Sequence, residues 1–126
     1  MKVELYALCQ GAFNSNGQLT IVNTIDNFVV PTFPARISFG LALKLYILPE
    51  EEGEKTLSIS ILDKENKSVI TPIVANLHIE YLGKASHIAI ALNLQNVLFE
   101  KSGAYDVHLE LDGERLDNFA FEIEQR

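Results

Sequence analysis

The stretch Ser102-Gly103-Ala104-Tyr105-Asp106-Val107-His108-Leu109-Glu110-Leu111-Asp112-Gly113 decides the fold class. Apolar and polar side chains alternate in it, which is the period of a strand with one buried and one solvated face. Phe119-Ala120-Phe121-Glu122-Ile123-Glu124 returns with the same alternation, so we predict a closing hairpin. Asp112-Gly113 suits a turn with positive φ, and the residues before Phe119 predict a loop longer than the two-residue form.

The chain has 126 residues and a mass of 14.1 kDa, which predicts a single domain over residues 1–126. Such a domain buries roughly two thirds of its unfolded surface without a disulfide. Its one cysteine, Cys9, is in phase with Val3, Leu5 and Ala7 and is predicted to be buried as a small apolar residue.

The net charge of −7 opposes binding to nucleic acid, because phosphate affinity comes from clustered Lys and Arg. Glu4 interrupts the first apolar run and Gln10 ends it, and nowhere do about 18 apolar residues follow one another. We therefore expect no membrane span and a cytoplasmic location.

Charge is distributed unevenly along the chain. Before Glu50 the charged residues are Lys2, Glu4, Asp26, Arg36 and Lys44. The first part of the chain is therefore either central in the fold or covered by something else.

Further strands are predicted in order. Lys2–Cys9 is followed by an Asn16-Gly17 turn signal and a return strand, Gln18–Asn23. Thr24–Pro34, with two prolines, is predicted to be an extended crossing segment that changes sheets. The longest alternating series then predicts a central strand, with inward residues Ile37, Phe39, Leu41, Leu43, Leu45 and Ile47.

The second half predicts strands over Leu57–Ile61, Val69–Val74, Leu77–Tyr81 and Ile88–Leu94, before the closing hairpin. Because Pro72 cannot donate a backbone hydrogen bond, Val69–Val74 is predicted to be an edge strand or a bulged strand. Several short strands without helix-length windows predict an all-β chain: an antiparallel, immunoglobulin-like β-sandwich of about seven to nine strands. Tyr105 is either the tyrosine of a sheet corner, with its hydroxyl bonded to backbone, or a core residue at the start of a strand.

A metal site is conceivable but is not favoured. Asp106, His108 and Glu110 alternate on one polar face, where roots two residues apart are about 6.6 to 7 Å apart. A complete ligand set needs another strand, and only His78 or His87 supplies a histidine. Each histidine is predicted to face solvent, so we expect no metal and no cofactor.

Calcium binding and nucleophilic or phosphate chemistry have little support in the sequence. Acidic turns, Glu50–Glu54 and Asp63–Asn66, offer oxygens suitable for calcium, but solubilising charge explains them as well. No Gly-x-Ser-x-Gly elbow or phosphate-binding glycine motif is present. We expect no enzyme and no catalytic residue.

The low-charge segment Phe28 to Leu48 is either a strand covered on both faces or an exposed patch. On the second interpretation its anchors are Phe28, Phe33, Tyr46 and Leu48.

A family resemblance rests on Cys9-Gln10-Gly11-Ala12, on Asn16-Gly17-Gln18-Leu19 with the strand that follows to Asp26, on Phe33-Pro34 and on the late Gly-x-Tyr hairpin. With these motifs the chain resembles a family of small bacterial proteins of unknown function. Its members tend to show Cys-Asp-x-Ala, a Gly-Lys-Leu return strand and a closing Gly-x-Tyr strand. This chain has Gln10 and Gln18 where an acidic and a basic residue are usual, which puts any site at the acidic position in doubt. The resemblance implies an all-β domain and no particular activity.

We therefore predict a non-catalytic interaction or structural module that binds a protein partner or itself, as a homodimer, through Phe28 to Leu48. The alternative is a small-ligand or metal-binding protein, or an enzyme, that uses the His and carboxylate cluster of Asp106, His108, Glu110, His78 and His87.

Overall fold

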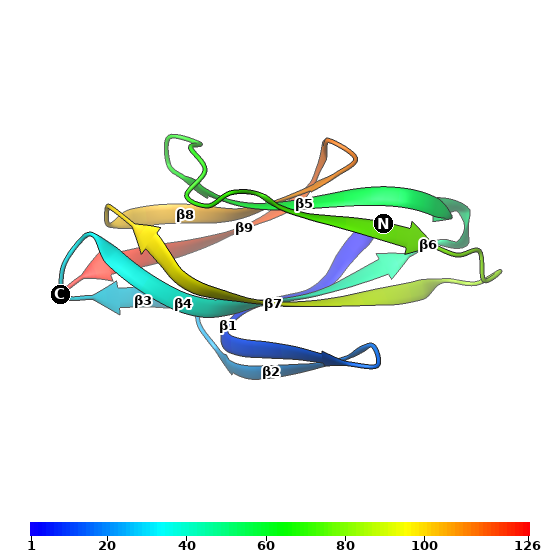
Figure 1. Cartoon of the computed structure of the whole chain (residues 1–126), viewed down its shortest axis with the longest axis horizontal. Helices are drawn as coiled ribbons and strands as arrows, with labels where there is room; N and C mark the ends of the chain where they lie inside the picture. The colour runs from blue at the N-terminus through cyan, green and yellow to red at the C-terminus, as the bar shows by residue number, and fades with distance from the viewer. The chain divides into compact units, whose positions relative to one another are not determined.

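The computed structural model describes all residues from Met1 to Arg126, and the fold is all-β. Nine strands form a four-stranded sheet of order β2-β1-β4-β7 and a five-stranded sheet of order β3-β9-β8-β5-β6 (Figure 1). The elements are β1 (Lys2–Ser15), β2 (Gln18–Thr24), β3 (Asn27–Val30), β4 (Ala35–Ile47), the 3-10 turn η1 (Pro49–Glu51), β5 (Gly53–Asp63), β6 (Ile73–Ile79), β7 (Ser86–Phe99), β8 (Gly103–Leu111) and β9 (Glu114–Gln125). The prediction of an all-β chain with seven to nine strands in two sheets is confirmed. None of its helical segments could cross a bilayer.

Contacts within the chain divide it into two compact units, whose segments alternate along the sequence. Unit 1 contains Met1–Ile25, Ser38–Lys55 and Leu77–Leu94, and unit 2 contains Asp26–Ile37, Thr56–Asn76 and Gln95–Arg126. Each unit is described by itself below. The prediction of a single domain over residues 1–126 stays a prediction.

In unit 1, the N-terminal hairpin is longer than the sequence suggested. Asn16 and Gly17 have φ of 54° and 82°, so they form the two-residue turn with positive φ at both positions that an Asn-Gly signal favours. The prediction that β1 ends at Cys9 is wrong, because the strand continues to Ser15 and pairs there with Gln18. The hairpin is the blue pair of strands in Figure 1.

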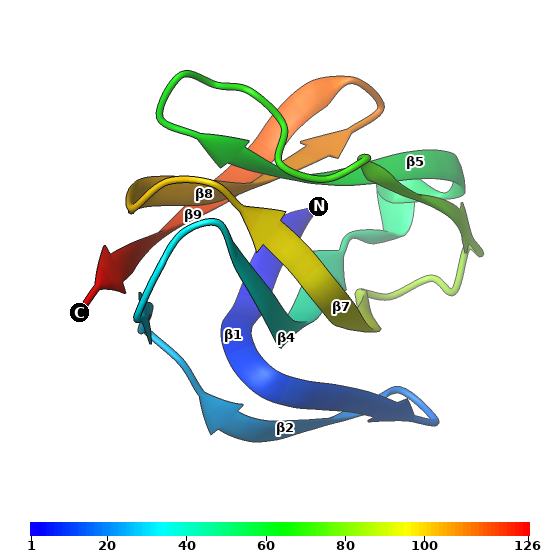
Figure 2. The same cartoon turned by 60° about the vertical axis from the view of Figure 1, so that its left-hand side comes forward.

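Strand β1 bends where it leaves its neighbour β4, as Figure 2 shows. The β1–β4 pairing reaches Cys9 opposite Gly40. A Cβ at Gly40 would lie 3.0 Å from Cys9 Sγ and 3.1 Å from backbone atoms of Gly11. These separations are tighter than most Cβ contacts, so a side chain at position 40 would push Cys9 or the Gly11 backbone aside, and the bend favours glycine there.

A register shift between Val3 and Leu5 changes which side chains of β1 point inward. The shift places Val3 on the face opposite Leu5, which stays in phase with Ala7 and Cys9. Leu5 is nevertheless 39% exposed. Ala7 and Cys9 are buried as predicted.

Strand β4 lies between β1 and β7, which confirms that it is a central strand. Its residues from Phe39 to Leu43 are buried on both faces. One cluster of unit 1 contains buried Ala7, Cys9, Ala12 and Ala42, with Leu19, Ile21 and Ala91 packed against it.

In unit 2, the closing hairpin β8–β9 turns more tightly than predicted. Asp112 and Gly113 have φ of 51° and 83°, and β9 already begins at Glu114. The prediction of a longer loop is wrong, because Glu114–Asn118, polar apart from Leu116, continues the strand and a register shift near Glu110 absorbs one residue.

Aromatic rings organise the core of unit 2. The Phe99 ring meets those of Tyr105 and Phe121 edge to face, with centroids 5.0 and 6.2 Å apart. Phe28 meets Phe121 in the same way at 5.8 Å. Tyr105 stacks on Phe121 at 5.7 Å, so these rings form one cluster.

Two further predictions change in the structure. The strands expected over Val69–Val74 and Leu77–Tyr81 are one strand, β6, which begins directly after Pro72 because proline fixes φ and cannot donate a ladder bond. It is an edge strand, as Pro72 suggested.

The crossing segment Thr24–Pro34 changes sheets, as predicted. Within it, Asn27–Val30 forms β3, which pairs in parallel with β9 and so departs from the prediction of an antiparallel sandwich.

Candidate functional site

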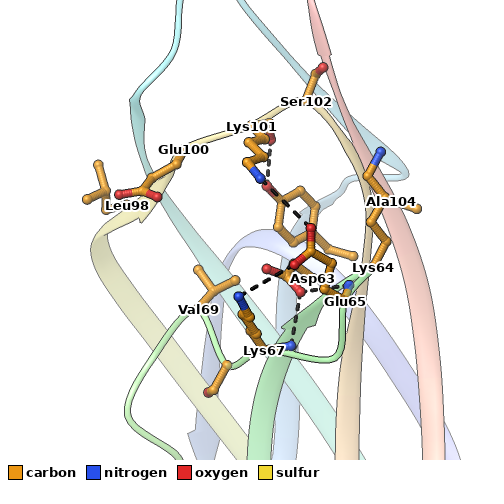
Figure 3. A pocket seen from close by; sticks show the side chains of 12 residues that line it. Asp63, Lys64, Glu65, Lys67, Val69, Leu98, Glu100, Lys101, Ser102 and Ala104 are labelled. Atoms are coloured by element: carbon orange, nitrogen blue, oxygen red, sulfur yellow. Dashed lines mark hydrogen bonds and ion pairs between the residues drawn. The ribbon is translucent and has the colours of Figure 1, made fainter.

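A pocket of about 370 Å³ lies at one end of unit 2 (Figure 3). One wall is the loop that follows β5, and the other is the turn from β7 into β8. The two walls meet because Asp63 at the end of β5 pairs with Tyr105 near the start of β8. Residues that line it include Asp63, Lys64, Glu65, Lys67, Lys101 and Tyr105.

Asp63 organises the first wall. One of its carboxylate oxygens accepts hydrogen bonds from the backbone N–H groups of Glu65 and Lys67, both at 2.9 Å. Its own N–H donates to the Lys67 carbonyl, and Asn66 takes the positive φ that this turn needs. The hydrogen bond from the Lys67 amide is the main cause of a lowered Asp63 pKa, helped by the Glu65 amide and by the charges of Lys67 and Lys101.

Tyr105 organises the second wall. Its hydroxyl donates to the backbone carbonyl of Lys101 at 2.5 Å, while its ring belongs to the aromatic cluster. This is the geometry of a tyrosine corner, and it decides between the two interpretations left open for this residue. Burial raises the Tyr105 pKa, and the nearby charges of Asp63 and Glu100 add to the effect.

The charges around the pocket have both signs. Glu65 lies 3.5 Å from the Lys67 ammonium and 4.0 Å from that of Lys101, and all three side chains are well solvated. Lys64 places its ammonium beside Gly103, within 3.2 Å of where a Cβ would be. Exposed pairs of this kind contribute little stability, so they are free to exchange partners with a polar solute.

Several oxygens of the pocket are already engaged by the loop that follows β5. Asp63 is occupied by backbone donors, and the Ser68 hydroxyl donates to the Ile70 carbonyl. No base lies within hydrogen-bonding distance of that hydroxyl to activate it. Two of the side chains suited to calcium are engaged within the pocket, because Asp63 Oδ1 accepts from the backbone of its own turn and Glu65 faces two lysines.

Each predicted histidine pairs with one glutamate. In unit 1, His78 Nδ1 lies 2.5 Å from Glu54 Oε1, and His87 Nε2 lies 2.8 Å from Glu4 Oε2. In unit 2, His108 Nε2 lies 3.1 Å from Glu110 Oε1. The prediction that every histidine faces solvent fails for His108, whose side chain is only 24% exposed.

These pairs do not build a metal site. No three side chains of His, Cys, Asp or Glu are grouped so that they could hold an ion. Asp106, on the same strand as His108, is half-buried and pairs by register with Ala120. Pairing with Glu54 raises the His78 pKa, first through the hydrogen bond and then through its charge.

The residues predicted as interface anchors fall in both units. In unit 2, Phe28 is half-buried against Phe121, and Phe33 is half-buried before the cis Pro34. In unit 1, the Tyr46 ring lies 5.4 Å from the His87 ring and 5.3 Å from the Lys2 ammonium, and Leu48 is 38% exposed. Phe28 and Tyr46 therefore have aromatic partners within the chain.

The pocket was not predicted from the sequence. Both segments that form its walls were recognised, one as the acidic turn Asp63–Asn66 and the other as the start of the Gly-x-Tyr strand. What was missing is the β5–β8 register, which places Asp63 opposite Tyr105 across about 40 residues of intervening chain.

Solved structures similar to this chain share little sequence with it. The alkylpurine DNA glycosylase AlkC of Pseudomonas fluorescens, solved with DNA containing an abasic site analogue, is 13% identical over 94% of this chain, with a TM-score of 0.48. This chain spans only 30% of that protein. An immunoglobulin-like protein of Pseudomonas aeruginosa, PA1606, is 14% identical over 98% of this chain and 95% of its own, with a TM-score of 0.40. At such scores neither structure carries an argument about function.

No curated protein matches the sequence. A family model does match, and it extends over residues 4–124, nearly the whole chain. The expected resemblance to a family without an assigned activity is thereby confirmed. The chain belongs to the family of unknown function DUF6941.

Proposed function

We propose that this protein is a non-catalytic interaction module that associates with a second copy of itself through the low-charge segment Phe28 to Leu48. The observation that carries the proposal is strand β3 at the edge of the five-stranded sheet. It contains no charged side chain, and Val29 on it is 50% exposed. An apolar, uncharged strand with one unpaired side is a surface that another chain can cover.

The absence of an assembled reactive site supports the non-catalytic part. The three histidines are each held by a single glutamate, and Cys9, a potential nucleophile, is fully buried. Burial also raises the Cys9 pKa, which opposes formation of a thiolate.

Substitutions on the segment test the proposal. Val29→Lys and Phe33→Asp place charge on its exposed side, and both are expected to shift the protein towards the monomer in sedimentation equilibrium. Val74→Lys, on a different edge strand and 59% exposed, is the matched control and keeps the wild-type mass. Wild-type mass in the Val29 and Phe33 variants would remove this segment as the contact.

The pocket favours a second candidate function, the binding of a small polar ligand. Its three lysines, two of them paired with the solvated carboxylate of Glu65, suit an anionic or zwitterionic group. A thermal shift screen of small anions and zwitterions tests it. Binding should raise the melting temperature of the wild type and not of a Lys64→Ala, Lys101→Ala double variant, and a screen without any shift would remove this candidate.

A further inference from the structure

The outer edge of β2 is the least protected strand edge that lies wholly within one unit. Residues from Leu5 to Ile25 include no charged side chain, although the chain has a net charge of −7. Natural edge strands are usually protected by charge, proline, a bulge or short length. β3 has four residues and is followed by Pro31, whereas β2 has seven residues and no proline.

The hairpin geometry shows which backbone groups face that edge. Ala12 is opposite Ile21, and both its N–H and its carbonyl point away from β2 and bond to the side chain of Asn93, at 3.0 and 2.9 Å. In an antiparallel pair, two residues directly opposite each other either exchange their N–H and C=O hydrogen bonds or both direct these groups away from the partner strand. Ile21, and by the same alternation Leu19, therefore direct their N–H and C=O groups to the outer side, where the sheet has no further strand.

The side chains make this edge compatible with a second copy. Thr20 is exposed and lies between Leu19 and Ile21. If two copies of β2 pair in antiparallel fashion about Thr20, Leu19 of each exchanges backbone hydrogen bonds with Ile21 of the other, and Thr20 faces Thr20. Threonine pairs across strands are favourable, and the regular part of β2 used here ends before Asn23, which has a φ of 49°.

Charge does not oppose a second copy at the β2 edge itself. Two chains of charge −7 repel each other over most of their surfaces, but every cross-strand pair in this arrangement is uncharged. The neighbouring face adds apolar surface: Phe13 is 58% exposed, and Val22, on the same face of the hairpin, is 39% exposed.

We propose that two copies of this protein join through their β2 strands, related by a two-fold axis at Thr20, into a continuous sheet. This inference rests on the proposed self-association and adds a contact at β2, separate from the Phe28 to Leu48 segment, so chains that use both contacts assemble beyond a dimer.

A charge on the axis tests the inference. Thr20→Lys places two lysines opposite each other and is expected to weaken the dimer at least about tenfold in sedimentation equilibrium. Ser15→Lys adds the same charge to the inner strand of the same hairpin and should keep wild-type association. An equimolar mixture of Thr20→Lys and Thr20→Glu should form a heterodimer, since opposite charges then meet on the axis.

The outcomes separate the inference from the proposed function. A wild-type dimer that Thr20→Lys dissociates, with its circular dichroism spectrum unchanged, supports pairing through β2. A wild-type dimer that persists in Thr20→Lys and dissociates in Phe33→Asp supports the proposed function and overturns this inference. A wild type that is monomeric at every concentration overturns both.

Discussion

The Asn93 side chain bonds both backbone groups of Ala12, accepting from its N–H at 3.0 Å and donating to its carbonyl at 2.9 Å. The side-chain amide of Asn93, on β7, thus supplies hydrogen-bond partners to the backbone of β1 at Ala12, beyond the end of the β1–β4 pairing. Beside it, Asn14 donates to the Ala89 carbonyl at 2.9 Å. These bonds hold the hairpin whose outer edge we propose as a dimer contact.

Asn93→Ala is expected to lower the free energy of unfolding by roughly 1 to 2 kcal/mol, because Ala12 is fully buried and loses partners for two polar groups. Urea denaturation measures the change. Gln95→Ala, an exposed position two residues along the same strand, should change stability by less than about 0.5 kcal/mol. Equal stability of the Asn93 and Gln95 variants would contradict this role.

Gly40→Ala is expected to destabilise the protein by about 1 to 3 kcal/mol, because the added methyl meets Cys9 Sγ and the Gly11 backbone. Gly11→Ala is the control, since its Cβ would have no neighbour closer than 3.7 Å and its φ is not positive. Thermal melting of the two variants should separate them by several degrees. If Gly40→Ala melts with the wild type, the close crossing at the β1 bend is wrong.

Tyr105→Phe removes the hydroxyl that donates to the Lys101 carbonyl and keeps the ring in the aromatic cluster. The expected cost is about 0.5 to 1.5 kcal/mol, the usual net value of one hydrogen bond. Tyr81→Phe, at a position 64% exposed, is the matched change and should be neutral. A neutral Tyr105→Phe would show that the corner bond contributes nothing to stability.

The His78 pKa should lie above its ordinary value of 6.5, because Glu54 accepts its hydrogen bond and stabilises its charged form. A histidine with a raised folded-state pKa adds stability that is full below its unfolded pKa and disappears as pH rises through the folded value. NMR titration of the ring should show Glu54→Gln lowering this pKa more than Glu80→Gln, whose charge is the weaker contributor. Equal effects of the two variants would contradict the assignment.

Alternation predicted most of this fold from the sequence because each strand buries one face. Leu57, Ile59 and Ile61 are buried, as are Val107 and Leu109, and Asn-Gly placed the first turn correctly. Errors arose where the period is interrupted. A bulge put Val3 out of phase with Leu5, Ala7 and Cys9. The polar residues at the start of β9 are typical of a loop, so the two-residue turn at Asp112-Gly113 was missed.

The site was less predictable than the fold, because it depends on register and not on period. Asp63 was recognised in an acidic turn and Tyr105 at a strand start, but only pairing between β5 and β8 brings them together. The partners of the histidines are equally nonlocal: Glu4 is 83 residues from His87 and Glu54 is 24 residues from His78. Alternation along one strand contains no information on such neighbours.

Sedimentation equilibrium of the wild-type chain, over a wide concentration range at moderate ionic strength, tests the central claim most directly. The account predicts a weight-average mass that rises with concentration from 14.1 kDa to at least twice that value. A mass that stays at 14.1 kDa at every concentration would contradict it.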